Sequence, residues 1–297
     1  MEKTILVTGA TSGIGKVTAR ALAQQGHRMV LLARDVQKAE ETAAEIRRSA
    51  GHDRVETLLC DLGSQAQIRR AAEEFKRRHD RLHVLVNNAG GIFMKHGLSA
   101  DGIEQTFAID HLAYFLLTNL LSDVLKASAP ARVVNVASAA SAGGHIDFDD
   151  PELKGRYNGI RAYSNAKLAN ILFSNELARR LSGTGVTSNA LHPGVVATGF
   201  GRNDNGIFTL AVKLARPFLV SEEEGARTSI HLATSPEVEG VTGQYFVKRR
   251  RRRPPREALD ESVARRLWDV SARMTGVQLA LTDVKVGADD TRRDAST

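Results

Sequence analysis

A tyrosine and a lysine four positions apart, Tyr163 and Lys167, are the side chains best suited to proton transfer. At this spacing both project from one face of a helix. Tyrosine is a poor acid or base at its ordinary pKa of about 10. A nearby ammonium group, together with a positively charged cofactor ring, favours tyrosinate and moves that pKa toward the working pH. Such a pair could give an alkoxide its proton during carbonyl reduction, although the same spacing also occurs in ordinary amphipathic helices.

A hydroxyl group for holding a substrate oxygen is expected after the apolar run 132–137. Two serines compete for this role, Ser138 directly after the run and Ser141 three residues later. Either serine could instead serve only as a turn residue at the end of a strand.

A glycine-rich loop, Thr8–Gly15, follows the apolar run Ile5-Leu6-Val7 and precedes a helical stretch. Its glycines have the spacing Gly-x3-Gly-x-Gly. Glycines let a backbone turn tightly and approach a pyrophosphate, and the helix N-terminus offers N–H groups to it. The sequence therefore predicts a dinucleotide site here, against the alternative of a tight turn without a ligand.

The end of the second expected strand indicates which dinucleotide is bound. Ala33 leaves no carboxylate at the strand tip, and Arg34 can meet a 2′-phosphate with a charge-assisted fork. This favours NADP, against the alternative that Asp35 holds a ribose or caps the next helix. Asp61, after the third strand, could accept from the adenine amino group or cap the helix that follows Ser64.

The elements that must position these residues alternate between strands and helices. This alternation predicts a single α/β domain with a doubly wound, Rossmann-type parallel sheet of about seven strands. Ser64 and Ser221 have the features of helix N-caps. The expected strands are 4–8, 28–33, 55–60, 83–87, 132–137, 186–191 and 244–247, and the expected helices are 14–25, 36–50, 64–78, 104–126, 161–181 and 222–233.

Composition excludes several classes of protein. The chain has 297 residues, 42% hydrophobic and 25% charged, with no apolar stretch long enough to span a membrane. The single cysteine, Cys60, excludes an internal disulfide framework and favours a cytoplasmic setting. The net charge of +7 comes from the basic run Lys248–Arg256, which we expect to be a solvated loop ended by Pro254-Pro255. Binding to nucleic acid or to a membrane surface is therefore not expected.

Four motifs in order give the chain its resemblance to a known family. The glycine-rich loop, Asn87–Gly90, the Tyr163/Lys167 pair and Pro193-Gly194 resemble those of short-chain dehydrogenases/reductases. The segments 115–121, 164–172 and 190–194 resemble the retinol-dehydrogenase-like branch. The resemblance covers about residues 3–275.

The resemblance implies a domain organisation and a set of site residues. An NADP-binding domain would span 1–275, with a lid at about 199–220, a C-terminal helix at about 256–275 and a polar tail at 276–297. Tyr163 would be the acid/base, Lys167 would tune it and hold the nicotinamide ribose, and Ser138 would hold the substrate oxygen. His192 is expected to be positional. The implied cofactor contacts are Gly9, Ser12, Gly13, Ile14, Gly15, Arg34, Asp61, Leu62, Asn88, Ala89, Gly90, Tyr163, Lys167, Pro193, Gly194, Val196 and Thr198.

One catalytic position departs from the family pattern. The family has an Asn in the helix before the fifth strand, where this chain has Asp110. A main-chain role in a proton relay survives this substitution, but a carboxylate near Lys167 could pair with it. The hypothesis is that Asp110 keeps the relay and changes the pH optimum. The alternative is a residue at a helix kink that faces solvent.

The expected substrate is an apolar alcohol, aldehyde or ketone. The segment Gly199–Val220 is partly apolar, as a lid would be, although it could equally pack as a helix or form a dimer contact. Ile146, Phe148 and Tyr157 could add to the pocket wall. The family also implies a homodimer or homotetramer, and no metal site is predicted. The rival interpretation is a non-catalytic NADPH sensor or scaffold that uses residues 248–256 to bind a partner.

Overall fold

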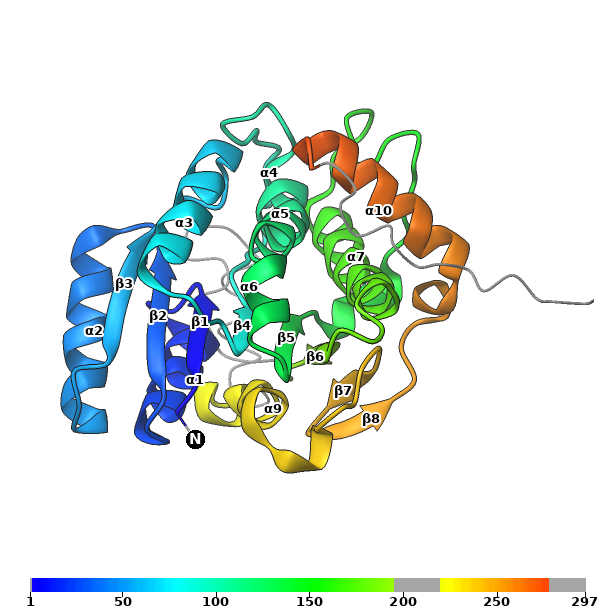
Figure 1. The fold of residues 1–297 in the computed structure, drawn as a ribbon. Helices are drawn as coiled ribbons and strands as arrows, with labels where there is room; N and C mark the ends of the chain where they lie inside the picture. The colour runs from blue at the N-terminus through cyan, green and yellow to red at the C-terminus, as the bar shows by residue number, and fades with distance from the viewer. Residues whose placement is uncertain (1, 195–219, 278–297) are drawn as a thin grey trace, which may run out of the picture.

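The computed structural model describes residues 2–194 and 220–277. Its centre is one sheet of eight strands in the order β3-β2-β1-β4-β5-β6-β7-β8 (Figure 1). The first seven strands are parallel and β8 runs antiparallel to β7. The predicted doubly wound α/β fold is therefore confirmed, with one strand more. The strands are β1 (Thr4–Thr8), β2 (Arg28–Ala33), β3 (Val55–Leu59), β4 (Val84–Asn87), β5 (Ala131–Val136), β6 (Val186–His192), β7 (Tyr245–Val247) and β8 (Arg250–Arg252).

Strands β1 and β2 contain continuous apolar runs because helices cover both faces of the sheet. Ile5, Leu6 and Val7 of β1 are all fully buried. Leu6 packs toward α3 (Gln65–Arg78), α5 (Ala113–Leu120) and α7 (Gly159–Arg180). Its neighbours in β1 pack on the opposite face toward α1 (Gly13–Gln24), α2 (Val36–Ala50) and α9 (Glu222–Thr234). No helix within 2–194 and 220–277 is long and apolar enough to cross a membrane.

The last described helix, α10 (Glu261–Thr275), lies along α7 (Figure 1). Its Trp268 ring stacks on Phe173 at 5.9 Å and meets Phe115 edge-on at 4.8 Å. The sequence predicted a helix from residue 256, and this start is wrong. Asp260 caps the helix by accepting from two backbone N–H groups, and residues 256–259 form a separate 3₁₀ turn.

The predicted serine N-caps are confirmed, whereas the long helix predicted over 104–126 is interrupted. Ser64 and Ser221 do cap α3 and α9, each accepting from a backbone N–H in the first turn. The stretch expected as one helix over 104–126 is helical, but it is not a single regular α-helix. The chain instead forms α4 (Gln105–Phe107), the π-helical turn η1 (Ala108–Leu112), α5 and α6 (Ser122–Ala127). Such π turns are rare and occur frequently at functional sites, and this one contains Asp110.

The basic run after β7 is not the loop that the sequence predicted. Arg250–Arg252 form β8, which pairs with Tyr245–Val247 in a β-hairpin whose turn has two residues. Its turn residues, Lys248 and Arg249, have φ angles of 50° and 63°. Tight hairpins require positive φ at both positions and usually place Asn-Gly there. Two residues with large side chains in this conformation cost roughly 1–2 kcal/mol each, which the strand pairing must offset.

Candidate active site

The candidate site lies at the carboxyl ends of the central strands, where β1 and β4 are neighbours and the direction of the crossovers reverses. Ligands of open parallel sheets bind at such a switch point. The Thr8 hydroxyl at the end of β1 accepts from the backbone N–H groups of Asn88 and Ala89, at 2.8 and 3.0 Å. It thereby ties the loop after β4 to the glycine-rich loop.

The glycine-rich loop is too tightly packed for larger residues. A Cβ at Gly15 would lie 2.3 Å from the Gly9 carbonyl oxygen and 2.4 Å from Nδ2 of Asn88. Gly9 and Gly13 have positive φ angles of 65° and 55°. Asn88 closes the loop by donating to the Thr8 carbonyl at 2.9 Å. These three glycines are therefore required for the close backbone approach that a pyrophosphate site needs.

The first turn of α1 has the donor groups that a phosphate needs. Ser12 stands at the N-cap with extended backbone, but its side chain makes no capping hydrogen bond. The helix N-terminus therefore keeps free N–H groups and the positive end of the dipole. Ile14 is almost buried and packs with Val17 and Ala226 beneath the loop. The residues present thus fit a dinucleotide pyrophosphate.

At the end of β2, either Arg34 could meet a 2′-phosphate of the adenosine ribose or Asp35 could hold its hydroxyl groups. Asp35 caps α2 by accepting from the Lys38 N–H at 3.0 Å. Arg34 is exposed and makes no hydrogen bond or ion pair within the described part of the chain. The guanidinium is thus available at the strand tip, while the neighbouring carboxylate is engaged as a cap.

The end of β3 lies next to this position. One Asp61 oxygen accepts from the Gly63 N–H at 2.9 Å, and the Asp61 N–H donates to Gln67. Ser64, and not Asp61, is the cap of α3. Leu62 is half-buried against the core formed by α3, α5 and α7. Asp61 is half-buried as well, so the strand end remains a candidate contact for an adenine ring.

Helix α7 carries the tyrosine and lysine on one face, one turn apart. Asn158 caps it by accepting from the N–H groups of Ile160 and Arg161. Tyr163 is 8% exposed and Lys167 is 4% exposed. The Lys167 Nζ lies 5.4 Å from the centre of the Tyr163 ring. The amphipathic-surface alternative is excluded for this pair because both side chains are buried at the sheet edge.

The two candidate serines after β5 have different surroundings. The Ser138 side chain hydrogen-bonds to Tyr163, and this bond works to lower the tyrosine pKa. Ser141 is 1% exposed, donates to the Ser138 carbonyl at 2.6 Å and contacts Tyr245. Ser138 is therefore the serine that faces the tyrosine, and Ser141 is part of the packing beneath it.

Asp110 is completely buried and forms an ion pair with Lys167, at 3.0 Å between Oδ2 and Nζ. Its other oxygen accepts from the Gly91 N–H at 2.9 Å. A Cβ at Gly90 would lie 2.9 Å from both members of the pair. The solvent-facing alternative for Asp110 is therefore wrong. The carboxylate links the loop after β4 to the lysine on α7.

Burial and charge oppose each other within this cluster. Burial raises the pKa of Tyr163, Lys167 works to lower it, and Asp110 raises it further. The net direction of these contacts is upward, so a lowered tyrosine pKa requires the positive nicotinamide ring as well as the lysine. Burial lowers the pKa of Lys167, but Asp110 outweighs this and holds it above its ordinary range. Burial raises the pKa of Asp110, opposed by Lys167 and by the Gly91 N–H.

Sequence reasoning missed Tyr114, which belongs to the same cluster. Its hydroxyl donates to the Ala89 carbonyl at 2.8 Å, and its ring centre lies 5.6 Å from the Lys167 Nζ. It is four residues after Asp110, so the two share a helix face. That spacing was the signal available in the sequence. Thr8 and Gly91 were missed because their roles depend on backbone contacts between distant segments.

The end of β6 completes the described site. His192 accepts through Nδ1 from the N–H groups of Ala139 and Gly194, at 3.1 and 3.4 Å. It thus holds the loops after β5 and β6 together, in line with the positional role expected for it. Pro193 and Gly194 follow directly, and Gly194 has a φ of 99°. Val196, Thr198 and the expected lid at 199–219 lie outside the described residues.

The three residues expected to line a pocket wall have other contacts. Ile146 is buried in the core with α7 and α10, and Phe148 packs against that core with the Arg266 guanidinium over its ring. The Tyr157 hydroxyl donates to the Phe93 carbonyl at 2.6 Å and also contacts Glu104. Their packing gives all three residues structural roles, and their place in a pocket wall stays a prediction.

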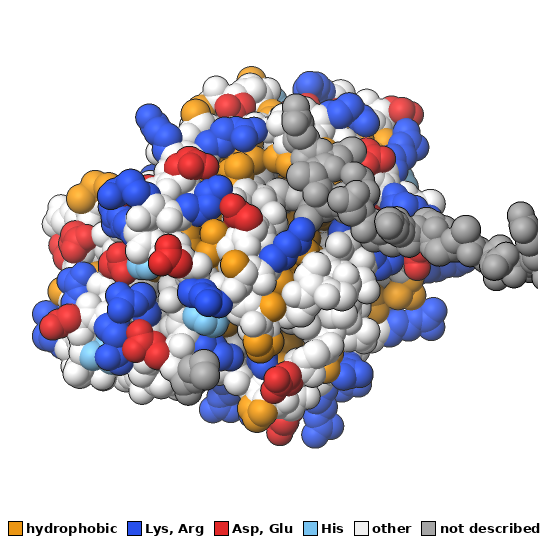
Figure 2. Space-filling model, in the orientation of Figure 1, with side chains coloured by type: hydrophobic (Ala, Val, Ile, Leu, Met, Phe, Trp, Pro, Cys, Tyr) orange, Lys and Arg blue, Asp and Glu red, His pale blue; other side chains and the backbone are white. Residues whose placement is uncertain are grey.

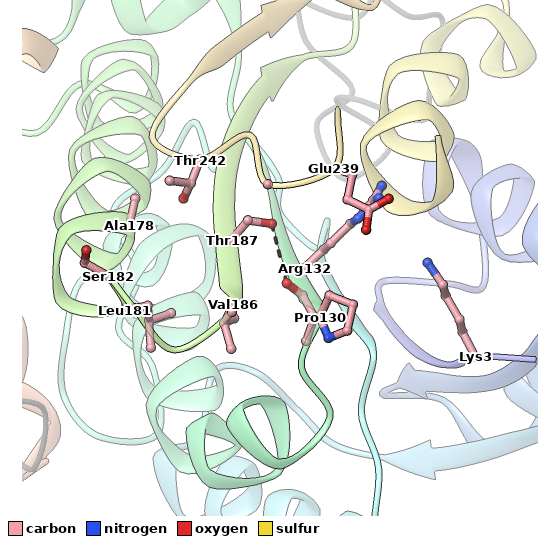
Figure 3. A pocket seen from close by; sticks show the side chains of 14 residues that line it. Lys3, Pro130, Arg132, Ala178, Leu181, Ser182, Val186, Thr187, Glu239 and Thr242 are labelled. Atoms are coloured by element: carbon pink, nitrogen blue, oxygen red, sulfur yellow. Dashed lines mark hydrogen bonds between the residues drawn. The ribbon is translucent and has the colours of Figure 1, made fainter. Parts of the chain in front are cut away.

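A separate cavity of about 410 Å³ lies at the opposite, amino-terminal edge of the sheet (Figure 3). Lys3 precedes β1 there, and Val186 begins β6. Arg132 lies in its wall and donates to the carbonyls of Leu232 and Ser235, so it anchors the end of α9. None of the proton-transfer residues lines this cavity.

Comparison with known proteins agrees with this geometry. The short chain dehydrogenase family model matches residues 3–206. The chain is 44% identical over 289 residues to Retinol dehydrogenase 13 from Homo sapiens, covering 93% of this chain and 85% of the relative. It is 44% identical over 276 residues to Retinol dehydrogenase 12 from Mus musculus, covering 93% and 87%.

Solved structures show the same architecture. A crystal structure of an uncharacterized protein from Mycobacterium paratuberculosis superposes with a TM-score of 0.74 and 31% identity, covering 92% of this chain and 93% of the other. The NADP active-site complex of Pseudomonas aeruginosa RhlG has a TM-score of 0.66 and 26% identity, covering 88% and 96%. With its fold, its motifs and these relatives, the chain belongs to the short-chain dehydrogenase/reductase family and is an oxidoreductase of the retinol-dehydrogenase-like kind.

Proposed function

We propose that this enzyme interconverts an apolar alcohol and its aldehyde or ketone with NADP(H), using Tyr163 as the acid/base. The observation that carries the proposal is one cluster, in which Tyr163 hydrogen-bonds to Ser138 and lies beside the Lys167 ammonium. The cluster stands at the carboxyl edge of the sheet, on the same edge as the glycine-rich loop. Proton transfer and dinucleotide binding are thereby brought together.

The proton path follows from the donors present. When bound, the nicotinamide supplies the hydride for reduction. Ser138 donates a hydrogen bond to the substrate oxygen and holds it beside the tyrosine. The Tyr163 hydroxyl gives its proton to that oxygen as negative charge develops on it, and the resulting tyrosinate is stabilised by Lys167. In the oxidation direction the same groups act in reverse, and tyrosinate takes the proton of the alcohol.

Arg34 supports NADP as the preferred cofactor. A planar, exposed guanidinium at the tip of β2 can form charge-assisted hydrogen bonds with a 2′-phosphate. A ribose 2′-hydroxyl would instead need a free carboxylate, and Asp35 uses its side chain as a helix cap. The RhlG structure is described as a complex with NADP, which agrees with this choice.

The relatives support an apolar substrate, because the names of several of them specify retinol. Retinol, its aldehyde and linear or cyclic analogues share an apolar carbon skeleton with one oxygen at the reacting end. Ser138 and Tyr163 supply the polar groups for that oxygen. A lid from residues 199–220 would cover the remainder of the substrate.

A substrate panel tests this proposal. Consumption of NADPH or NADH would be followed with retinal, linear aldehydes, aromatic aldehydes and cyclic ketones, together with direct measurement of NADPH binding. We expect turnover of apolar carbonyls with NADPH, and weaker turnover with NADH. Tight NADPH binding without turnover of any panel member would instead favour a cofactor sensor, the rival role in which Asp110 neutralises Lys167.

A further inference from the structure

The hairpin of β7 and β8 carries a concentration of positive charge that the reaction does not use. Seven of the nine residues from Lys248 to Arg256 are basic. Without them, the basic and acidic side chains of the chain are equal in number, at 34 each. Residues 248–253 and Arg256 are all exposed. Figure 2 shows basic side chains along the lower right rim of the molecule, where Figure 1 draws the hairpin.

These basic groups form no ion pair within the described residues. The acidic residue directly after this stretch, Glu257, pairs with His145 and accepts from the Ile146 N–H. No ion pair links any of the seven basic groups to a carboxylate in 2–194 or 220–277. Like charges at such density repel one another, so a polyanionic surface that neutralises them would bind with favourable free energy.

The turn of the hairpin lies on the same edge of the sheet as the active site. Val247, the last residue of β7, is level with His192 at the end of β6. His192 in turn accepts from Ala139, the residue after Ser138. Two strand spacings separate β5 from β7, so Lys248 lies roughly 10 Å to the side of the catalytic hydroxyls.

The hairpin holds its basic residues in a fixed arrangement. The Arg249 N–H donates to the Thr228 hydroxyl of α9 at 3.2 Å, which anchors the turn. Arg250 and Arg252 pair across the hairpin with Val247 and Tyr245 and lie on the same face as these partners. Arg251 lies on the other face. β8 is the last strand of the sheet, and its exposed arginines disfavour edge pairing with a second copy.

We propose that this hairpin docks the enzyme on an anionic lipid bilayer, with the active-site edge turned toward the membrane. The orientation rests on the proposed function, because an apolar alcohol or aldehyde would dissolve in the bilayer. The docking itself does not depend on the proposed function. A single-stranded nucleic acid fits less well, because the run 248–256 contains no aromatic residue on which bases could stack; duplex DNA is the competitor in the test. Each Lys or Arg close to an anionic leaflet strengthens binding roughly fivefold.

Vesicle co-sedimentation of the full chain tests the docking. The vesicles would be phosphatidylcholine alone, or phosphatidylcholine mixed with phosphatidylglycerol. The test variant replaces Arg250, Arg251 and Arg252 with glutamine. The matched control makes the same charge change elsewhere, with exposed Arg48, Arg70 and Lys126 replaced by glutamine. A third variant replaces the three strand arginines with lysine and keeps their charge.

The proposal predicts binding to the anionic vesicles alone, weakened about 100-fold in the glutamine variant of β8 and by less than about threefold in the control. The lysine variant should bind like the wild type, and added salt should release the protein. Unchanged NADPH binding in each variant shows that the domain is folded. Three results would each overturn the docking. The first is an equal loss of binding in the test and control variants, and the second is binding to the neutral vesicles. The third is displacement of the protein from anionic vesicles by duplex DNA at equal charge concentration. A protein that binds anionic vesicles but turns over no carbonyl would leave the docking intact and contradict only the proposed function.

Discussion

The carboxylate of Asp110 and the ammonium of Lys167 form an ion pair of 3.0 Å that is almost completely removed from solvent. The same carboxylate accepts from Gly91 in the loop after β4. Family resemblance predicts an asparagine at position 110, which could accept these contacts but carries no charge. The charge on Lys167 is therefore partly neutralised, and its effect on the neighbouring Tyr163 is reduced.

Replacing Asp110 with Asn should move the pH dependence of alcohol oxidation to lower pH. Asp110 raises the pKa of Tyr163, so loss of its charge lowers that pKa. Oxidation needs tyrosinate, so the rising limb of the pH–rate profile should shift to lower pH. Asp123→Asn, at an exposed carboxylate on α6, is the control and should leave the profile in place. An unchanged profile in Asp110→Asn would show that the charge has no influence on the tyrosine.

This relationship could be only half predicted from the sequence. The substitution at position 110 and its pairing with Lys167 follow from the motif order and from charge. The π-helical turn that contains Asp110 does not, because residues 104–126 have a continuous helical pattern and nothing in it indicates an i→i+5 hydrogen bond. The Gly91 contact joins segments that only the folded sheet brings together.

The strands show the same division between local pattern and tertiary context. The seven parallel strands were predicted within a residue or so at most ends, because buried parallel strands are continuous apolar runs. The eighth was missed because Arg250–Arg252 have neither an apolar pattern nor high strand propensity. Their conformation is decided by pairing with Tyr245–Val247, and such pairing is not visible in local composition.

Replacing Arg34 with Ala should raise the KM for NADPH by about 10- to 100-fold, which corresponds to the loss of a charge-assisted hydrogen bond. The KM for NADH should change little, because NADH lacks the 2′-phosphate. Steady-state kinetics with both cofactors measures the effect. Arg48→Ala, at the far end of α2, is the control and should affect neither constant. Equal changes for both cofactors would argue against phosphate recognition by Arg34.

Replacing Thr8 with Val should lower the free energy of unfolding by about 2–4 kcal/mol, because two backbone N–H groups lose their acceptor. The side chain is 1% exposed, so water cannot replace the hydroxyl without rearrangement. Urea unfolding measures the change. Thr57→Val on β3, whose hydroxyl contacts Glu40 near the surface, should change stability by no more than about 0.5 kcal/mol. Similar losses in both variants would mean that Thr8 has no special role.

His111 should make the folded state less stable in acid. Burial lowers its pKa to about 4 from 6.5, so the unfolded chain binds more protons between these values. Its stabilising contribution is present above pH 6.5 and lost as the pH falls toward 4, an effect on the order of 3 kcal/mol. Urea unfolding at several pH values in this range measures the free energy of unfolding. This free energy should fall less steeply with decreasing pH in His111→Gln than in the exposed control His96→Gln. Parallel slopes for the two variants would contradict the assignment.

Single-turnover reduction of an accepted carbonyl by Tyr163→Phe tests the role of Tyr163 as acid/base most directly. We expect a rate of the chemical step about 10²- to 10⁴-fold lower than the wild type, with NADPH affinity changed much less than the rate. Tyr245→Phe removes another buried phenol, one that contacts Ser141, and should keep a rate close to the wild type. A Tyr163→Phe enzyme that reduces the substrate at the wild-type rate would contradict the assignment of Tyr163 as the acid/base.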